Sequence, residues 1–152
     1  MDEPCLAAHL RVSAAGQPLT PEEKDSETIA MIYVRDYLTA RGWTVDDISM
    51  EFRGYDLLAV RGNQQRCVEV KGVWHAASST GIRMTGNEVL IATQQRTAYW
   101  LYVVDQCNDG RGRLFGAFGD PLTTFRADIK AEAIFKVPGS SLTAARDKEN
   151  NE

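Results

Sequence analysis

The sequence has few cysteines and no long apolar run. Its three cysteines (Cys5, Cys67 and Cys107) are odd in number and follow no metal-ligand spacing, so we expect free thiols in a reducing cytoplasm rather than a disulfide framework. No apolar stretch approaches the roughly 18 residues that a membrane helix needs. The first residues also lack the basic start and apolar stretch of a signal peptide. We therefore expect a cytoplasmic protein with no membrane partner.

Basic side chains are also scarce, which bears on nucleic-acid binding. The net charge is −4 at pH 7, so the whole chain lacks the basic surface of a tight nucleic-acid-binding protein. The distribution is uneven, because residues 53–96 hold six basic and three acidic side chains. Such a locally basic segment can contact phosphates. The candidate nucleic-acid-binding residues in it are Arg53, Arg66 and Arg83.

The chain is long enough for one domain with a real core. It has 152 residues, and its 43% hydrophobic and 25% charged content is ordinary for a globular protein. We expect a loose N-terminal arm over residues 1–19 and a folded domain over residues 20–137. From residue 138 to residue 152 the small and polar composition favours a flexible tail.

Residues 54–71 have the pattern of a β-hairpin. Two apolar runs flank Gly62-Asn63, and this pair favours a two-residue turn because glycine readily adopts positive φ. With these turn residues, Asp56 on one strand faces Glu69 on the other. Side chains two residues apart share a face of a strand, so Lys71 projects beside Glu69. The sequence thus predicts two acids and an amine on one face of an apolar hairpin.

This group suggests a site for a metal ion and a water molecule. Carboxylates directly across a ladder repel each other unless a cation lies between them. Two carboxylates and a main-chain carbonyl are the hard oxygen donors that suit Mg²⁺. The alternative is an acid pair at the rim of the sheet that Lys71 holds apart as a salt bridge, without a metal.

The remaining elements give the order helix, strand, strand, strand, helix, strand. Thr20 to Glu23 reads as a helix start, with an N-cap, a proline at the first helical position and a capping box. A second capping box begins at Thr85. We therefore expect an α/β protein, an α+β arrangement around a mixed sheet, in which the last strand of this series runs parallel to the Glu69 strand. The expected helices cover residues 21–41, 85–96 and 121–125, the expected strands residues 43–45, 55–60, 65–71, 99–104, 114–118 and 133–137, and residues 72–81 form a loop.

This arrangement resembles the PD-(D/E)XK nucleases, the restriction-endonuclease-like fold with an αβββαβ core, here with extra C-terminal strands. The resemblance covers about residues 21–105. Within it, the chain is more narrowly similar to the C-terminal domain of the plant NO VEIN protein. The narrower resemblance is carried by Gly54-Tyr55-Asp56, by Val68-Glu69-Val70-Lys71-Gly72, by Thr85 with Asn87-Glu88, and by the aromatic strand at 99–104. Tyr55 stands where the general motif has proline, and Glu88 already has a local role in the second capping box.

The resemblance implies metal-dependent hydrolysis of phosphodiester bonds, with DNA as the expected substrate of an endonuclease in defence or repair. Asp56, Glu69 and the main-chain carbonyl of Val70 would hold Mg²⁺, for which Mn²⁺ can substitute. Lys71 would orient the attacking water and stabilise developing negative charge. Glu27 matches by position a helix-one glutamate that some members use. Trp74 is either a substrate contact or a cap on the sheet edge.

Two other functions stay open. The chain could be a catalytically silent nuclease-like module that binds a partner protein or nucleic acid. It could also be a Holliday-junction-type resolvase, although the basic residues expected on a junction-binding face are few. Because the surface is not strongly basic, we expect a homodimer or a helicase-type partner to contribute part of the affinity for nucleic acid.

Overall fold

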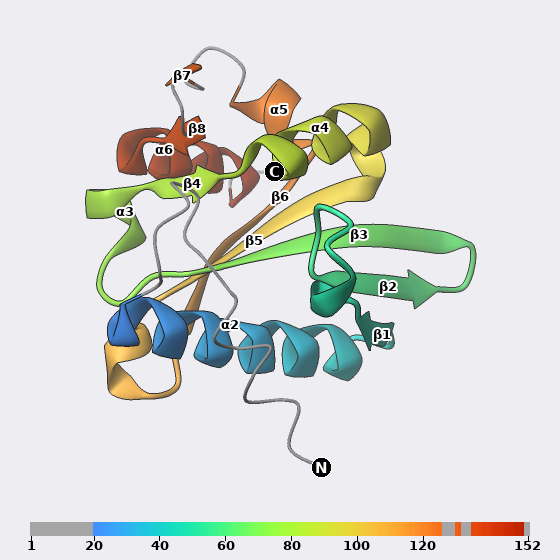
Figure 1. Ribbon diagram of the computed structural model, residues 1–152, viewed down its shortest axis with the longest axis horizontal. Coiled ribbons are helices and arrows are strands. Elements are labelled where there is room, and N and C mark those ends of the chain that lie inside the picture. Colours follow the sequence, from blue (N-terminus) through green and yellow to red (C-terminus); the bar gives the residue numbers. More distant parts are fainter. Residues whose placement is uncertain (1–19, 126–129, 132–134, 151–152) are drawn as a thin grey trace.

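The computed structural model describes residues 20–125, 130–131 and 135–150 (Figure 1). A five-stranded sheet in the order β1-β2-β3-β5-β6 forms its centre. Neighbouring strands are antiparallel except β3 and β5, which run parallel as expected. The strands are β1 (Thr44–Asp47), β2 (Leu57–Arg61), β3 (Gln64–Gly72), β5 (Tyr99–Asp105) and β6 (Arg113–Gly119). The expected mixed α/β architecture is therefore confirmed.

Helix α2 (Pro21–Ala40) covers one face of this sheet, and α4 (Gly86–Gln95) lies over the other (Figure 1). The predicted start of α2 is confirmed, since the Thr20 hydroxyl accepts a hydrogen bond from the Glu23 amide and the Glu23 carboxylate accepts one from the Thr20 amide. Its apolar stripe packs on even-numbered residues of β3. The buried residues of this layer include Ala30, Val34, Leu38, Val68, Val70 and Tyr102.

The hairpin has the predicted two-residue turn and register. Gly62 has a φ of 58°, and Arg61 pairs with Gln64 and Leu58 with Cys67. Asp56 lies one residue before β2, where its amide donates to the Val68 carbonyl over 2.9 Å. The paired ladder ends at Leu57 opposite Val68, so Asp56 is not paired within the strand as expected, and its side chain instead accepts a hydrogen bond from the Val70 amide of β3.

A second, smaller sheet was not expected in full. Strands β4 (Ile82–Met84), β8 (Phe135–Val137) and β7 (Lys130–Ala131) form it in that order. The segment expected as a loop holds the short helix α3 (Ala77–Thr80), and α5 (Pro121–Thr124) matches the expected short helix. Strand β8 matches the end of the expected strand at 133–137, whose first two residues lie outside the described part. The unexpected elements α3, β4 and β7 have only two to four residues each, which is too few to show a repeating pattern.

The expected flexible tail is wrong over most of its length. Helix α6 (Gly139–Glu149) packs beside α3, with Leu142 fully buried and the Arg146 guanidinium 4.5 Å from the centre of the Phe115 ring. A few small apolar residues are enough to hold α6 in place, because α3 and β6 already provide the surface on which it packs. The expected arm over residues 1–19 lies outside the described residues. Within the described ranges, none of the helices combines the length and apolar character needed to cross a membrane.

The contact between α2 and β3 gives a stability test. A Cβ at Gly72 would overlap the backbone carbonyl of Ser26, so Gly72→Ala should lower the free energy of unfolding by about 2 kcal/mol in urea denaturation. Gly86→Ala is the matched control, because a Cβ there meets nothing within 4 Å at the start of α4. It should be neutral or stabilising by up to about 1 kcal/mol. Equal effects of the two changes would contradict this packing.

Candidate active site

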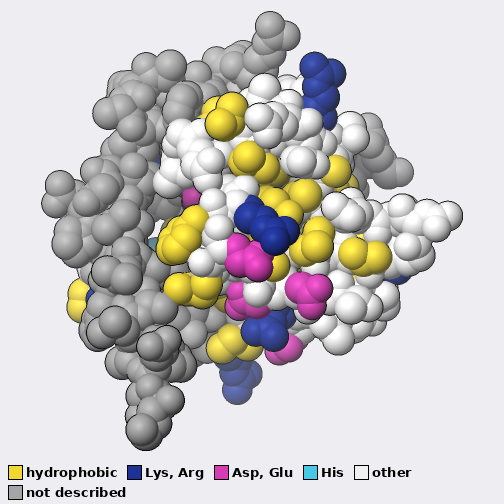
Figure 2. Space-filling model, turned by 45° about the vertical axis from the view of Figure 1, so that its right-hand side comes forward, with side chains coloured by type: hydrophobic (Ala, Val, Ile, Leu, Met, Phe, Trp, Pro, Cys, Tyr) yellow, Lys and Arg dark blue, Asp and Glu magenta, His cyan; other side chains and the backbone are white. Residues whose placement is uncertain are grey.

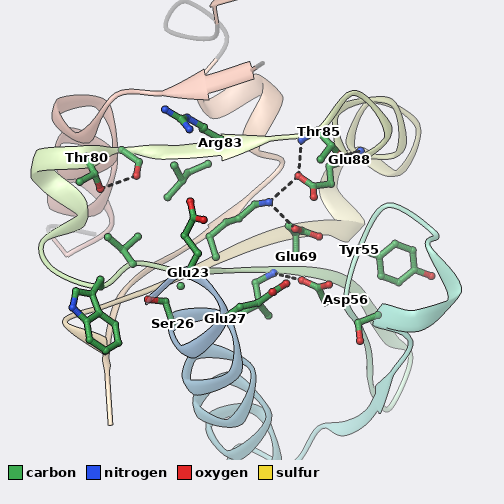
Figure 3. Close-up of a pocket in the computed structure, with 18 of the residues that line it drawn as sticks. Glu23, Ser26, Glu27, Tyr55, Asp56, Glu69, Thr80, Arg83, Thr85 and Glu88 are labelled. Atoms are coloured by element: carbon green, nitrogen blue, oxygen red, sulfur yellow. Dashed lines mark hydrogen bonds and ion pairs between the residues drawn. The ribbon is translucent and has the colours of Figure 1, made fainter. Parts of the chain in front are cut away.

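A cleft of about 720 Å³ opens between the start of α2, the loop before β2, the end of β3 and the β4–α4 junction (Figure 3). Figure 2 shows a face of the molecule on which acidic and basic side chains gather near the centre with apolar ones around them. Carboxylates outnumber cations in the cleft lining by six to two. The acids are Glu22, Glu23, Glu27, Asp56, Glu69 and Glu88, and the cations are Lys71 and Arg83.

The three residues predicted from the hairpin meet in this cleft (Figure 3). The Lys71 ammonium lies 2.9 Å from a Glu69 carboxylate oxygen. Oδ2 of Asp56 accepts a hydrogen bond of 3.0 Å from the Val70 amide. The hairpin register therefore placed Asp56, Glu69 and Lys71 correctly at one end of the sheet.

Glu88 is the residue whose role the sequence only partly indicated. Its Oε2 accepts from the Thr85 amide over 2.9 Å, which completes the predicted capping box. The same oxygen lies 2.9 Å from the Lys71 ammonium. One carboxylate thus begins α4 and also ties that helix to β3. The capping pattern is visible in the sequence, whereas the ion pair depends on a contact across the fold.

Burial and charge set the protonation of this group. Burial alone would lower the pKa of Lys71, but the carboxylates of Glu69 and Glu88 outweigh it and raise that pKa above its usual value. Burial and the nearby charge of Asp56 raise the pKa of Glu69 well above its ordinary range. For Glu88 the Lys71 ammonium and the Thr85 amide outweigh burial and lower the pKa. Lys71 is therefore held as a cation, whereas the raised pKa of Glu69 favours the neutral form of that side chain unless a further cation lies beside it.

The backbone on both sides of Asp56 is fixed by the surrounding elements. The Ile48 amide donates to the Asp56 carbonyl over 2.9 Å. The buried Tyr99 hydroxyl donates to the Gly54 carbonyl over 2.7 Å. Gly54 has a φ of 85°, and a Cβ there would lie 2.6 Å from an Ile91 side-chain carbon of α4. Glycine is required at this position by both conformation and space, and it sets the chain direction two residues before Asp56.

Three other predicted residues also line the cleft, namely Glu27, Trp74 and Arg83. Figure 3 shows Glu27 projecting from α2 into the cleft on the side of Asp56, and Arg83 on the β4 strand. Trp74 is half-buried. It packs against the residues under α2, as a cap on the sheet edge would, and it also lines the cleft.

The other two arginines are not part of the cleft lining. Arg53 pairs with Glu51 over 2.8 Å on the neighbouring loop. Arg66 lies on the opposite face of the sheet, where it donates to the Tyr102 hydroxyl over 2.7 Å and stacks 3.7 Å from the Trp100 ring centre. Alternation along β3 turns Arg66 away from the acids and toward α2, so this candidate for nucleic-acid contact lies outside the cleft.

The donor set in the cleft fits a hard divalent cation. Among the residues that the structure describes, no group of three histidine, cysteine, aspartate or glutamate side chains is placed to hold a metal ion. The expected set is smaller, with two carboxylates and one backbone oxygen. Asp56 and Glu69 would supply the carboxylate oxygens that Mg²⁺ prefers, and a bound cation would offset the repulsion between the two acids.

Comparison with known families identifies the chain. The family model for Protein NO VEIN, C-terminal, matches residues 26–115. The chain belongs to this family. The NO VEIN C-terminal match runs from within α2 into β6 and includes Asp56, Glu69, Lys71 and Glu88. The narrower resemblance drawn from the sequence is thereby confirmed.

Two further searches gave no match. No curated protein is significantly similar to the chain. No solved structure is significantly similar to it.

The buried ion pair predicts a large stability effect. Lys71→Met removes the cation that Glu69 and Glu88 share and should lower the free energy of unfolding by about 3 kcal/mol in urea with EDTA. Arg35→Met is the control, since it breaks an exposed pair of 3.8 Å with Asp47 and should cost less than about 1 kcal/mol. A Lys71 variant no less stable than the Arg35 variant would contradict the structural role of the pair.

Proposed function

We propose that the chain is a Mg²⁺-dependent nuclease of the PD-(D/E)XK type that hydrolyses DNA. The observation that carries this proposal is the convergence of Asp56, Glu69 and Lys71 in one cleft. The element order α2-β1-β2-β3-α4-β5, with α3 and β4 inserted, supports it because it matches the αβββαβ core. Two buried thiols, Cys67 and Cys107, are compatible with the cytoplasm as its compartment.

The residues of the cleft would have different roles in hydrolysis. Asp56, Glu69 and the Val70 carbonyl would hold Mg²⁺, which when bound neutralises phosphate charge and acidifies a water molecule. Lys71, held cationic by its two partners, stabilises negative charge that develops on the phosphate. Glu88 positions the Lys71 ammonium through their 2.9 Å contact. Glu27 lies on the same side of the cleft as Asp56 and can orient a water molecule.

The charge of the cleft bears on how substrate is held. Carboxylates outnumber cations there, so a phosphate backbone is repelled until divalent cations bind. Arg83 at the cleft and Arg53 beside it are the nearest candidates for phosphate contacts. We therefore retain a homodimer or a helicase-type partner as the source of additional affinity, in a defence or repair setting.

A catalytically silent module is the second candidate, and one observation favours it. Lys71 is already neutralised by two carboxylates, and Asp56 already accepts the Val70 amide. A group satisfied in this way can serve stability alone. Such a module would bind a partner without any dependence on divalent cations.

A cleavage assay distinguishes the two candidates. Labelled single-stranded and duplex DNA and RNA are incubated with the chain and Mg²⁺, Mn²⁺ or EDTA. We expect metal-dependent cleavage that falls by at least about 100-fold in Asp56→Asn and in Lys71→Arg. Asparagine can still accept the Val70 amide, and arginine keeps the charge, so both variants should fold.

Asp46→Asn on strand β1 is the matched control, because Asp46 is exposed and lies outside the cleft. Its activity should equal that of the wild type. Absence of metal-dependent cleavage from every substrate, or activity that survives in Asp56→Asn, would contradict the proposal.

A further inference from the structure

Phe52 stands at the mouth of the cleft with its side chain turned to solvent. It is 69% exposed, more than any other large hydrophobic residue that the structure describes. Met50, two residues earlier on the same turn, is 48% exposed. Neither residue has a role in the metal and lysine chemistry proposed above. The left-handed backbone of Phe52 and its place in the cleft lining, more than its exposure alone, make it a candidate for ligand contact.

The surrounding loop holds Phe52 in this position. Its backbone is left-handed, with φ 53° and ψ 41°, a conformation that is unusual for a bulky aromatic residue. The Asn87 side-chain amide of α4 donates to the Phe52 carbonyl over 3.3 Å. Two residues on, Gly54 packs against Ile91 and accepts from Tyr99. Bonds to the core thus fix the loop, and its aromatic ring is still left outside.

The charge of the cleft limits what such a ring can bind. Six carboxylates and two cations line it, so attraction between phosphate and the cleft surface contributes little to affinity. Stacking of a base on an aromatic ring does not depend on charge and is tolerant of sequence. Bases inside a duplex are already stacked on their neighbours, so only an unpaired or extruded base gains from a new ring.

We propose that Phe52 is a stacking platform for an unpaired base, and that the cleft therefore acts on single-stranded or locally unpaired nucleic acid. This inference rests on the proposed nuclease function and adds its substrate class. Phe52 lies on the loop that leads to Asp56, so a base on its ring would place the adjoining phosphate near the acids. Asn87 positions the ring through the Phe52 carbonyl.

The test measures binding separately from hydrolysis. Single-stranded oligonucleotides with one 2-aminopurine are titrated with the chain in Ca²⁺, which is a hard cation and a poor substitute in cleavage. Fluorescence quenching reports stacking, and anisotropy of a labelled strand reports affinity. We expect Phe52→Ala and Phe52→Leu to weaken single-strand binding by about tenfold or more and to remove the quenching. Phe52→Trp should retain both, and a blunt duplex should bind all four proteins equally weakly.

The control is Ile32→Ala, because Ile32 is 57% exposed on α2 and lies outside the cleft. It should bind like the wild type. Unchanged single-strand binding in Phe52→Ala, or binding retained by Phe52→Leu, would overturn stacking. A chain that cleaves DNA but shows no dependence on Phe52 refutes this inference alone. A chain that neither binds nor cleaves any strand refutes the nuclease proposal with it.

Discussion

The Lys71 ammonium lies 2.9 Å from an oxygen of Glu69 and 2.9 Å from an oxygen of Glu88, and most of the cleft depends on this arrangement. Glu69 is on the central strand β3, and Glu88 begins α4, so one cation joins the sheet to the helix above it. All three side chains are largely buried, and a buried charge without a partner lowers the stability of the fold. The position of α4, and through Asn87 and Ile91 the loop before Asp56, therefore follows from where Lys71 lies.

Side chains along β3 alternate between two faces of the sheet, so the residues that pack in the core lie on one face and the cleft residues on the other. Even-numbered residues of β3, such as Val68 and Val70, pack against α2, while Glu69 and Lys71 face the cleft. The hairpin turn at Gly62-Asn63 sets the register that places Leu57 opposite Val68 and leaves Asp56, the next residue back, in the same cleft as Glu69. A shift of one residue would turn all of these side chains to the other face. The apolar packing on α2 thus fixes the placement of the acids on the opposite side.

Features that repeat along the chain, or that depend on residues close together in it, could be predicted from the sequence. The two capping boxes, the hairpin register and the parallel β3–β5 pair all follow from short patterns, and with them the convergence of Asp56, Glu69 and Lys71. Features that depend on contacts across the fold were missed. The ion pair of Glu88, the burial of α6 and the position of Phe52 each require knowing which distant segment lies alongside. Arg66 could have been placed by alternation alone.

The proposed chemistry depends most on the binding of a divalent cation by Asp56 and Glu69 beside Lys71. Calorimetric titration of the chain with Mn²⁺ tests this most directly, with Asp56→Asn and the exposed Asp46→Asn as a matched pair. We predict one bound Mn²⁺ per chain in the wild type and in Asp46→Asn, and a loss of that binding in Asp56→Asn. No Mn²⁺ binding by the wild type, or equal binding by both variants, would contradict the metal site and leave the buried ion pair as a purely structural feature.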